Sequence, residues 1–328
     1  MKVLVVGGAG YIGSAMTEKL LEAGHEVTVF DNLSTGHRQF VPKKALFVKG
    51  DLRKLSDVKK LFRARKFDAV MHFAASALVG ESVADPFKYY ENNVLACLHL
   101  LKVMREKKVR LFIFSSTCAT FGEPKNIPIK DDDEQNPVNP YGRSKLMIEK
   151  VLDDLSHKGD IRHITLRYFN ACGAAASGKC GERHDPETHL IPNVLKAASG
   201  KKKGLVIFGN DYDTPDGTCA RDYIHISDIV EAHLLALNAL KKGMKSDFFN
   251  LGNGNGYSVM EIVAEAEKIT GKKINVKVGP RRPGDPARLV GDASKAARVL
   301  GWCPTRDLGE IIRSAWAWEI SRPAVRLR

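Results

Sequence analysis

Three glycines follow the first apolar run of the chain at intervals of three residues. The run Lys2–Val6 leads into the turn, and its glycines are Gly7, Gly10 and Gly13. Apolar residues then recur at helical spacing over residues 11–23. Glycine is needed where a chain turns tightly or where its backbone approaches another group closely. A strand, a glycine-rich turn and a helix in this order predict the first unit of an open parallel sheet.

Short apolar runs and helical patterns alternate through the first half of the chain. Strands are expected at residues 2–6, 26–30, 45–48, 68–73, 111–114 and 161–168. Helices are expected between them at residues 11–23, 56–65, 86–107 and 141–157. This alternation predicts an α/β fold with a doubly wound parallel (Rossmann) sheet covered by helices on both faces.

The composition changes after Asn170, where residues typical of loops become frequent over 171–187 and 209–218. Helical patterns return at 190–199, 227–241, 258–270 and 308–319, and short strands are expected at 204–208 and 247–251. We expect residues 1–170 to form the Rossmann domain. Residues 171–328 should mainly form a smaller α/β domain that closes over a ligand, with some of this chain returning to the first domain.

Composition excludes several classes of protein. Hydrophobic residues make up 44% and charged residues 27%, and no apolar run reaches the length of a membrane span. The first apolar run is broken by glycine too soon for a signal peptide, so a cytoplasmic location is expected. Six cysteines are scattered without a Cys-x-x-Cys pair or a cluster with histidine. We therefore expect free thiols, no disulfide framework and no metal site.

The formal net charge of +13 admits two interpretations. One is a nucleic-acid surface, and the other is an enzyme with an anionic substrate. The basic residues are spread along the chain, and the densest run, Lys201-Lys202-Lys203, follows a glycine in an expected loop. This distribution favours the enzyme and argues against a nucleic-acid partner.

The glycine-rich turn predicts a dinucleotide site. The N-terminus of a helix offers free N–H groups and a positive dipole to a pyrophosphate. The residues expected to hold it are Gly7, Gly10, Tyr11, Ile12 and Gly13.

An acidic residue ends the second expected strand. Asp31 stands about where a carboxylate binds the adenosine ribose hydroxyls, and it would repel a 2′-phosphate. The cofactor expected is therefore NAD rather than NADP. The alternative is that Asp31 only caps a turn beside Asn32 and Ser34.

Other strand ends lie on the same edge of the predicted sheet. Asp51 follows the third strand and is expected to contact adenine, or else to cap a helix. The segment Phe73-Ala74-Ala75 ends the fourth strand, where small residues allow a close approach to the dinucleotide, although core packing is an alternative. Asn32 and Leu52 adjoin these positions and complete the set of cofactor residues expected at this edge.

Tyr141 and Lys145 are four residues apart on an expected helix, so their side chains share one face. A nearby ammonium and a positively charged nicotinamide stabilise a phenolate, which makes tyrosine a usable base. Thr117 lies in the loop after the fifth strand, where its hydroxyl is expected to bond a reacting oxygen. The alternatives are an ordinary amphipathic helix and an ordinary turn hydroxyl. Cys118 has no neighbouring histidine in the sequence and is not favoured as a nucleophile.

These residues resemble the extended short-chain dehydrogenase/reductases, and more closely the UDP-glucose (UDP-galactose) 4-epimerases within them. The resemblance covers essentially the whole chain. It rests on the segments GGAGYIG, HFAA, VGESVADPFKYYENN, FIFSST, YGRSK, LRYFN, IFGNDYDTPDGTCARDYIH, and RRPGD followed by DASKA. It implies tightly held NAD, a transient 4-keto sugar, and Tyr141 as the base on the C4 hydroxyl with Lys145 and Thr117 in support.

The resemblance also implies contacts for further residues. Asn92 is expected near the cofactor and Tyr168 near the nicotinamide. The residues expected around the UDP-sugar are Phe169, Asn170, His189, Leu190, Val206, Phe208, Arg221, Tyr223, Arg282 and Asp285. For Arg221 and Arg282 the alternative is an ion pair with Asp222 or Asp285. A homodimer is also implied, with helices 84–107 and 141–157 as candidates for its interface.

The chain departs from the family pattern at several positions. Thr117 stands where serine is frequent, and Ala77 stands where a lysine is common near the cofactor. His189 replaces a frequent asparagine. Cys118-Ala119 replaces the Asp-Glu pair of related dehydratases, which argues against dehydration. Leu289 occupies the position that limits pocket size, so a UDP-N-acetylhexosamine or UDP-pentose 4-epimerase remains an alternative. A non-catalytic NAD- or RNA-binding protein is an alternative of another class, against which intact Tyr141 and Lys145 argue.

Overall fold

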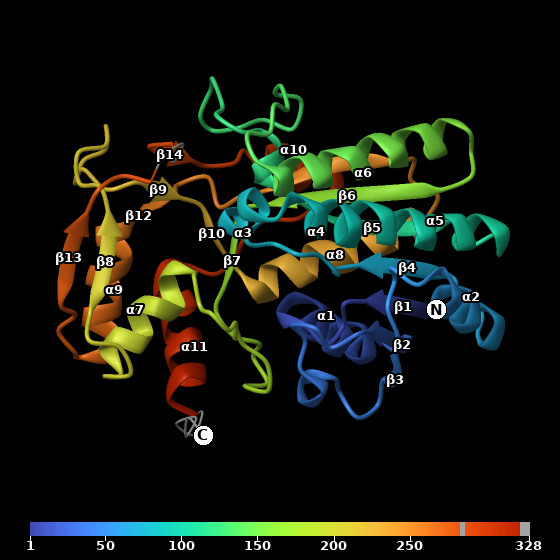
Figure 1. Ribbon diagram of the computed structural model, residues 1–328, viewed down its shortest axis with the longest axis horizontal. Helices are drawn as coiled ribbons and strands as arrows, with labels where there is room; N and C mark the ends of the chain where they lie inside the picture. The colour runs from blue at the N-terminus through green and yellow to red at the C-terminus, as the bar shows by residue number, and fades with distance from the viewer. Residues whose placement is uncertain (283–285, 322–328) are drawn as a thin grey trace.

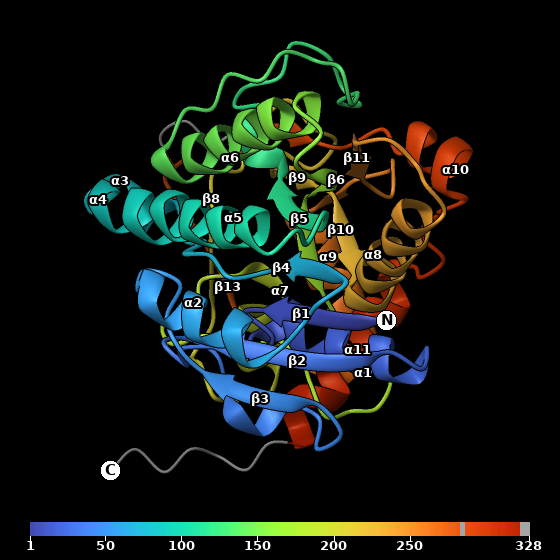
Figure 2. The ribbon, with the colours of Figure 1, turned by 90° about the vertical axis from the view of Figure 1, so that its right-hand side faces the viewer.

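Seven parallel strands form the central sheet of the computed structural model, which describes residues 1–282 and 286–321 (Figures 1 and 2). Their order across the sheet is β11-β6-β5-β4-β1-β2-β3. The strands are β1 (Lys2–Val6), β2 (Glu26–Asp31), β3 (Leu46–Lys49), β4 (Ala69–His72), β5 (Leu111–Thr117), β6 (Arg162–Tyr168) and β11 (Asp247–Leu251). The expected doubly wound parallel sheet is confirmed.

The strand expected at 247–251 joins this first sheet as its edge strand. β11 pairs in parallel with β6, from Asp247 opposite Ile164 to Leu251 opposite Tyr168. The second half of the chain therefore returns to the sheet, as expected. The division at residue 170 stays a prediction.

The pleat of β1 divides its side chains between two cores. Val3 and Val5 belong to one apolar cluster, and Leu4 and Val6 belong to another on the opposite face. All four are at most 1% exposed. A strand buried on both faces is the reason that the sequence shows a continuous apolar run rather than alternation.

Helices cover both faces of the sheet (Figure 2). On the face of Val3 and Val5 lie α1 (Tyr11–Glu22), α8 (Ile226–Lys241) and α10 (Ser294–Leu300). On the face of Leu4 and Val6 lie α2 (Leu55–Ala64), α5 (Ala96–Glu106) and α6 (Pro140–His157). The sequence analysis predicted all of these helices except α10.

The expected helix 86–107 is helical throughout but changes pitch. It consists of α4 (Pro86–Tyr89), a π-helical segment η2 (Tyr90–Leu95) and α5. A short helix α3 (Val79–Ala84), which the sequence analysis did not predict, precedes it. Single π-helical turns are frequent near functional sites, and this one contains Asn92 and Asn93.

A smaller group of elements lies at one end of the sheet (Figure 1). Its helices are α7 (Leu190–Ala198), α9 (Val259–Thr270) and α11 (Leu308–Ser321), packed around one apolar core. Its short strands are β7 (Asn170–Cys172), β8 (Leu205–Phe208), β9 (Ala220–Arg221), β10 (Tyr223–His225), β12 (Tyr257–Ser258), β13 (Val276–Gly279) and β14 (Arg288–Leu289). Two 3-10 turns, η1 (Arg38–Phe40) and η3 (Cys118–Thr120), belong to loops.

The expected helices and strands of this half are confirmed within two residues at each end, whereas most of its shortest strands were not predicted. None of the described helices is long and apolar enough to cross a membrane.

Candidate active site

The glycine-rich turn has no room for side chains. Gly7 has φ of 78°, and its N–H donates to the Phe30 carbonyl at 2.9 Å. An ideal Cβ on Gly7 would lie 2.5 Å from the Ala74 nitrogen, and one on Gly13 would lie 2.2 Å from the Gly7 oxygen. Both contacts are far inside van der Waals distance. The backbones of β1, α1 and the end of β4 can meet this closely only with glycine.

The first turn of α1 keeps its N–H groups free for a ligand. The helix begins at Tyr11 after Gly10, and no side chain of the described residues caps it. Uncapped N–H groups and the positive end of the helix dipole form an anion site. The turn therefore fits the pyrophosphate of NAD, and Tyr11, Ile12 and the three glycines lie where the sequence predicted them.

Asp31 ends β2 beside this turn and is almost buried. Its Oδ2 accepts the Ala9 N–H at 3.0 Å and its Oδ1 accepts the Leu33 N–H at 2.7 Å. Burial raises the pKa of the carboxyl group despite these two bonds. The turn-capping alternative is thus realised, and it also fixes the carboxylate at the edge where the ribose contact is predicted. The contact itself stays a prediction.

Asn32 and Asp51 meet at the ends of β2 and β3. The Asn32 amide donates to Asp51 Oδ2 at 3.3 Å, and the Arg53 guanidinium donates to the same oxygen at 2.6 Å. The hydrogen bonds of Arg53 lower the pKa of Asp51 to about 2. The N-cap position of α2 is Lys54, so the helix-capping alternative for Asp51 is wrong. Leu52 is buried in the core, and the sequence analysis did not single out Arg53.

The end of β4 and the π-helical segment complete the cofactor edge. Ala74 lies against Gly7, and the Phe73 ring packs 4.9 Å from the His233 ring. Asn92 donates to the Ser76 hydroxyl at 3.2 Å. Asn93 was not predicted as a site residue. Its side-chain oxygen accepts the Ser76 N–H, and its side-chain nitrogen donates to the Ser76 carbonyl. These bonds tie residues 74–76 to η2, so Ala75 and Asn92 share this edge with the glycine-rich turn.

The three predicted catalytic side chains lie on two neighbouring elements. Tyr141 and Lys145 are in α6, and Thr117 ends the adjacent strand β5. The Thr117 hydroxyl is hydrogen-bonded to the Tyr141 phenol and also accepts the Ala119 N–H at 3.2 Å. Thr117 therefore caps the turn η3, as the alternative held, and contacts Tyr141 as well. Lys145 donates to the Ser115 carbonyl at 2.8 Å and is buried.

The titration of these groups reflects their burial. Burial and the neighbouring Tyr168 raise the pKa of the Tyr141 phenol well above its usual value, while the Thr117 hydrogen bond lowers it. Burial lowers the pKa of Lys145 to about 8, so its ammonium keeps most of its proton at neutral pH. A positive charge beside the phenol would lower its pKa.

Two residues that were not predicted, Ser115 and His233, lie beside Tyr168, which is predicted to be near the nicotinamide. Burial raises the pKa of Tyr168 to about 12, and its phenol is hydrogen-bonded to the Ser115 side chain. The Ser115 hydroxyl also lies 2.9 Å from His233 Nε2, on α8. His233 is separated from Ser115 by more than a hundred residues, so no local pattern could reveal this contact.

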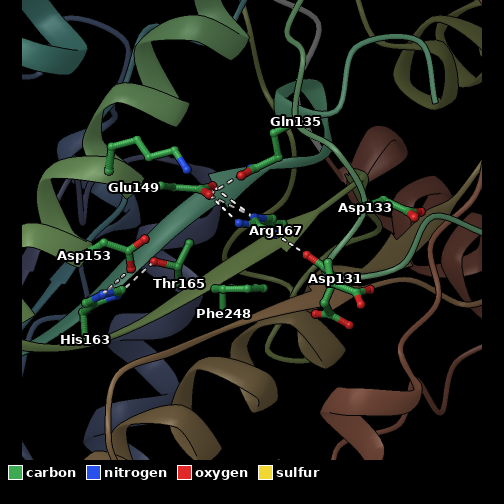
Figure 3. A pocket seen from close by; sticks show the side chains of 11 residues that line it. Asp131, Asp133, Gln135, Glu149, Asp153, His163, Thr165, Arg167 and Phe248 are labelled. Carbon is green, nitrogen blue, oxygen red and sulfur yellow. Dashed lines mark hydrogen bonds and ion pairs between the residues drawn. The ribbon is translucent and has the colours of Figure 1, made fainter. Parts of the chain in front are cut away.

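A buried ion pair stabilises α6 against the sheet behind the catalytic residues (Figure 3). Arg167 of β6 donates to both oxygens of Glu149, with the shortest contact at 2.6 Å. Gln135 donates to Glu149 at 3.0 Å, and the Ser116 hydroxyl also donates to it. Glu149 is about one turn after Lys145 and two turns after Tyr141, so it lies on the same side of α6 and holds that side against the sheet.

This ion pair borders a polar cavity of about 280 Å³. Figure 3 shows Asp131, Asp153 and His163 around it. The described residues that line the cavity include none of the predicted site residues. We therefore assign it no role in the chemistry.

The predicted substrate residues come from short elements of the smaller region. Asn170 starts β7 and donates to the Asp222 carbonyl at 2.9 Å. Phe169 is buried with Phe121 and Ile129, and Leu289 packs against this cluster. Cys118 packs there too, and burial raises the pKa of its thiol to about 12, which argues against a nucleophile.

The predicted uracil residues Val206 and Phe208 lie on one exposed face of β8. The Arg282 guanidinium lies 4.1 Å from the centre of the Phe208 ring, so a cation already stacks at this face. Tyr223 is buried on β10, and Arg221 on β9 donates to the Ala220 carbonyl at 2.7 Å. Asp285 lies outside the described residues.

His189 and Leu190 stand at the start of α7. His189 is the N-cap residue of this helix, and Leu190 is its first residue. The His189 ring contacts the Glu182 carboxylate, which raises the pKa of the imidazole. The N-terminus of a helix is suited to a diphosphate, and the contact of His189 with one stays a prediction.

Comparison with known proteins agrees with this geometry. The model of the NAD dependent epimerase/dehydratase family matches residues 3–252. A UDP-glucose 4-epimerase of Lactobacillus helveticus is 50% identical over 324 residues, which cover 98% of both chains. A crystal structure of a UDP-glucose 4-epimerase has a TM-score of 0.97 at 49% identity and full coverage of both chains. The UDP-glucose 4-epimerase from Brucella ovis in complex with NAD has a TM-score of 0.93 at 47% identity, covering 96% of this chain and 97% of its own.

Proposed function

Because the chain belongs to the NAD dependent epimerase/dehydratase family, we propose that it interconverts UDP-glucose and UDP-galactose by epimerisation at C4. One observation supports this most directly. The hydrogen-bonded pair of Tyr141 and Thr117 lies on the sheet edge where the glycine-rich turn leaves β1, with buried Lys145 beside it. An acid–base group next to a dinucleotide site is the arrangement that a reversible oxidation requires.

The cofactor is NAD, held by residues of the sheet edge. The three glycines and the open end of α1 would hold its pyrophosphate, and Asp31 would hold a ribose. When bound, NAD would accept the hydride from the sugar carbon, return it to the 4-keto sugar, and supply a positive charge in its oxidised form.

Tyr141 takes the proton from the C4 hydroxyl. It returns the proton after the 4-keto sugar has rotated in the site to present its other face. A phenol with an ordinary pKa near 10 needs about 4 kcal/mol of differential stabilisation to titrate near pH 7. Burial raises the pKa of the phenol, so the positive charges of Lys145 and the cofactor must stabilise the phenolate by more than burial destabilises it. The Thr117 hydroxyl orients the phenol, and Lys145 anchors α6 to β5 through the Ser115 carbonyl.

The substrate side closes over the nucleotide. The exposed apolar face of β8 with the Arg282 cation suits a uracil ring, and Arg221 suits the diphosphate. Asn170 and Phe169 border the sugar. These contacts rest on the family resemblance and on the position of each residue.

Turnover of UDP-galactose, followed by NMR on the purified protein, tests the proposal. We expect conversion to UDP-glucose and NAD in the released cofactor. Tyr141→Phe should keep NAD but lose about 10²–10⁴-fold in turnover, the usual contribution of an acid–base group. Tyr257→Phe, on β12, is the control and should keep its activity. Failure to convert UDP-galactose while a UDP-N-acetylhexosamine or a UDP-pentose is converted would favour the alternative substrates.

A homodimer is proposed through the helices expected for it. Apolar side chains are exposed along α3, α4, η2 and α5, including Val83, Phe87, Leu95 and Leu98. Phe87 is 85% exposed, which is unusual for a phenylalanine, and Met147 of α6 is exposed as well. Light scattering on the purified protein should give the mass of two chains, and the mass of one chain would contradict this.

A cytoplasmic location is proposed from the thiols. No cysteine of the described residues is part of a disulfide, and three of the six, Cys97, Cys172 and Cys180, are buried. Free thiols are typical of a reducing compartment.

A further inference from the structure

Two glutamates and two histidines from one short segment direct their donor atoms to a single point. The residues are Glu182, His184, Glu187 and His189, and the four donor atoms all lie within 4.8 Å of one another. The segment lies just before α7, outside the catalytic group. The sequence analysis expected no metal site because it searched for cysteine clusters, and only His189 was singled out.

We propose that these four side chains bind a divalent transition-metal ion of the zinc class, with one ion per chain. Imidazole nitrogens and carboxylate oxygens are ligands that such ions prefer. Two carboxylates neutralise the charge of a divalent ion, and two neutral imidazoles complete a four-coordinate set.

The distances fit a tetrahedral ion. Ligands about 2.0–2.1 Å from a tetrahedral centre lie about 3.3–3.4 Å from one another. His184 Nδ1 lies 3.5 Å from Glu182 Oε1 and 3.7 Å from Glu187 Oε1, and His189 Nδ1 lies 3.8 Å from Glu187 Oε1. The fourth pair, His189 and Glu182, is in direct contact and must open as the ion enters. The other three histidine–glutamate pairs need to close by only a few tenths of an ångström, and the remaining two pairs, His184 with His189 and Glu182 with Glu187, lie within 4.8 Å.

The cluster contains two buried carboxylates. The Glu182 and Glu187 side chains are only 7% and 4% exposed. Among the described residues, no lysine or arginine forms an ion pair with either carboxylate; the ion-pair partners are the two imidazoles. Buried carboxylates need a cation, a proton or a metal to offset the loss of hydration.

His184 supplies an independent observation. Its Nδ1 is buried and has no hydrogen-bond partner among the described residues, although it points to both carboxylates. The separations of 3.5 and 3.7 Å are too long for good hydrogen bonds. A buried nitrogen lone pair without a partner is costly, and a metal ion between it and the carboxylates would satisfy it.

Neighbouring groups already orient the ligands. The Trp318 indole donates to the Glu182 carbonyl at 3.0 Å. The Glu187 carboxylate accepts the His189 N–H at 3.1 Å and the His184 N–H at 3.3 Å. Such bonds around the ligand set fix the donor atoms and strengthen metal binding.

The position of the ion links the two parts of the molecule. Burial raises the pKa of the Tyr11 phenol in the glycine-rich turn, and the charges of Glu182 and Glu187 raise it further, while Trp318 belongs to α11. An ion here would hold the segment before α7 between the dinucleotide edge and the smaller region. Because each ring binds through Nδ1, the Nε2 of His189 remains available to an anionic substrate.

Calorimetric titration of chelator-treated full-length protein with Zn²⁺ tests the proposal. We expect one ion per chain with micromolar or tighter affinity and a rise in melting temperature with Zn²⁺. His184→Ala and Glu187→Gln should each weaken binding at least about tenfold. His157→Ala, which removes an exposed histidine at the end of α6, should bind as the unchanged protein does. No binding, or full affinity in both ligand variants, would overturn the site.

Titration with Co²⁺ provides a readout that needs no variant. Tetrahedral Co²⁺ with nitrogen and oxygen ligands gives intense visible bands, and these are expected at one equivalent. Absence of visible bands would overturn the assignment. A strong near-ultraviolet thiolate band would also overturn it, because the ion would then be bound by cysteine.

Discussion

The cofactor edge and the substrate side of this molecule are built in different ways. At the cofactor edge, Gly7, Asp31 and Asp51 each lie at or within two residues of the end of a strand of the seven-stranded sheet. On the substrate side, Asn170, Arg221 and Leu289 belong to strands of two or three residues in small separate sheets. The residues of the cofactor edge are positioned by backbone pairing between strands that the sequence predicts. The residues of the substrate side are positioned by contacts between side chains that are far apart in the sequence.

Two contacts illustrate the substrate side. The Phe169 ring lies so close to Gly291 that an ideal Cβ there would be 2.3 Å from it. Asp222 accepts the N–H groups of Asn253, Gly254 and Gly291. Segments far apart in the chain are joined here by single side chains. The cofactor edge should therefore be intolerant of added atoms in its backbone turn, and the substrate side should be sensitive to the loss of single side chains.

The largest expected effect is at the glycine-rich turn. Gly13→Ala places a Cβ 2.2 Å from the Gly7 oxygen and 2.9 Å from the Gly8 Cα, so the turn must open. We expect the purified variant to retain no NAD, measured as cofactor released per chain. Gly80→Ala, in α3 where an added Cβ meets nothing within 4 Å, is the control and should keep its cofactor. Full cofactor content in the Gly13 variant would show that NAD binding does not depend on the close packing of Gly13 against Gly7.

The second effect concerns the buried ion pair of Glu149 with Arg167, which stabilises α6 against β6. Glu149→Gln keeps the shape of the side chain but leaves Arg167 buried without its counter-charge. We expect the free energy of unfolding in urea to fall by about 3–5 kcal/mol. Glu134→Gln, which breaks the exposed pair with Lys125, should change it by only about 0–1 kcal/mol. Equal losses in the two variants would contradict the assignment of Glu149 as a buried anchor.

The third effect tests Asp222 through pH. Burial raises the pKa of this carboxyl group from 3.8 to about 6 in spite of its backbone hydrogen bonds. The folded state therefore holds a proton to a higher pH than the unfolded state. The resulting stabilisation is complete below pH 3.8 and is lost as the pH rises through 6, a change of about 2–3 kcal/mol.

The measurement compares Asp222→Asn with the unchanged protein in denaturant at pH 4.5 and pH 7. The stability advantage of the unchanged protein should be smaller at pH 7. Asp211→Asn is the control, because Arg281 lowers the pKa of the exposed Asp211 and no loss is expected between these pH values. A difference for Asp222 that stays constant with pH would contradict the raised pKa.

The smallest effect concerns Leu289, which packs against the cluster of Phe169. Leu289→Ala widens the site beside the sugar. We expect turnover of UDP-N-acetylgalactosamine to rise about tenfold relative to UDP-galactose, the low end of what a few methylene groups contribute to discrimination. Val299→Ala, exposed on α10, should leave the ratio unchanged. An unchanged ratio in the Leu289 variant would remove this residue from the control of pocket size.

The fold was largely predictable because its strands are buried and its helices are amphipathic. Strands such as β1 show as continuous apolar runs, and helices such as α6 are long enough for their periodicity to identify them. α10 has seven residues, and β9 and β14 have two residues each, which is too short for any period to show. The contact of Ser115 with His233 and the convergence of Glu182 with His184 depend on packing, so they were not predicted.

The sequence alone determined the parallel sheet, the glycine-rich turn and the helix that pairs Tyr141 with Lys145, because these depend on local backbone preferences and on spacing within single elements. The tertiary structure decided that the strand at 247–251 pairs with β6, that Glu149 supports α6 from a buried site, and that four side chains cluster before α7. It also revealed that burial raises the pKa of Tyr141. Such properties depend on the hydration and the charges that surround a group, and folding brings those neighbours from distant parts of the chain.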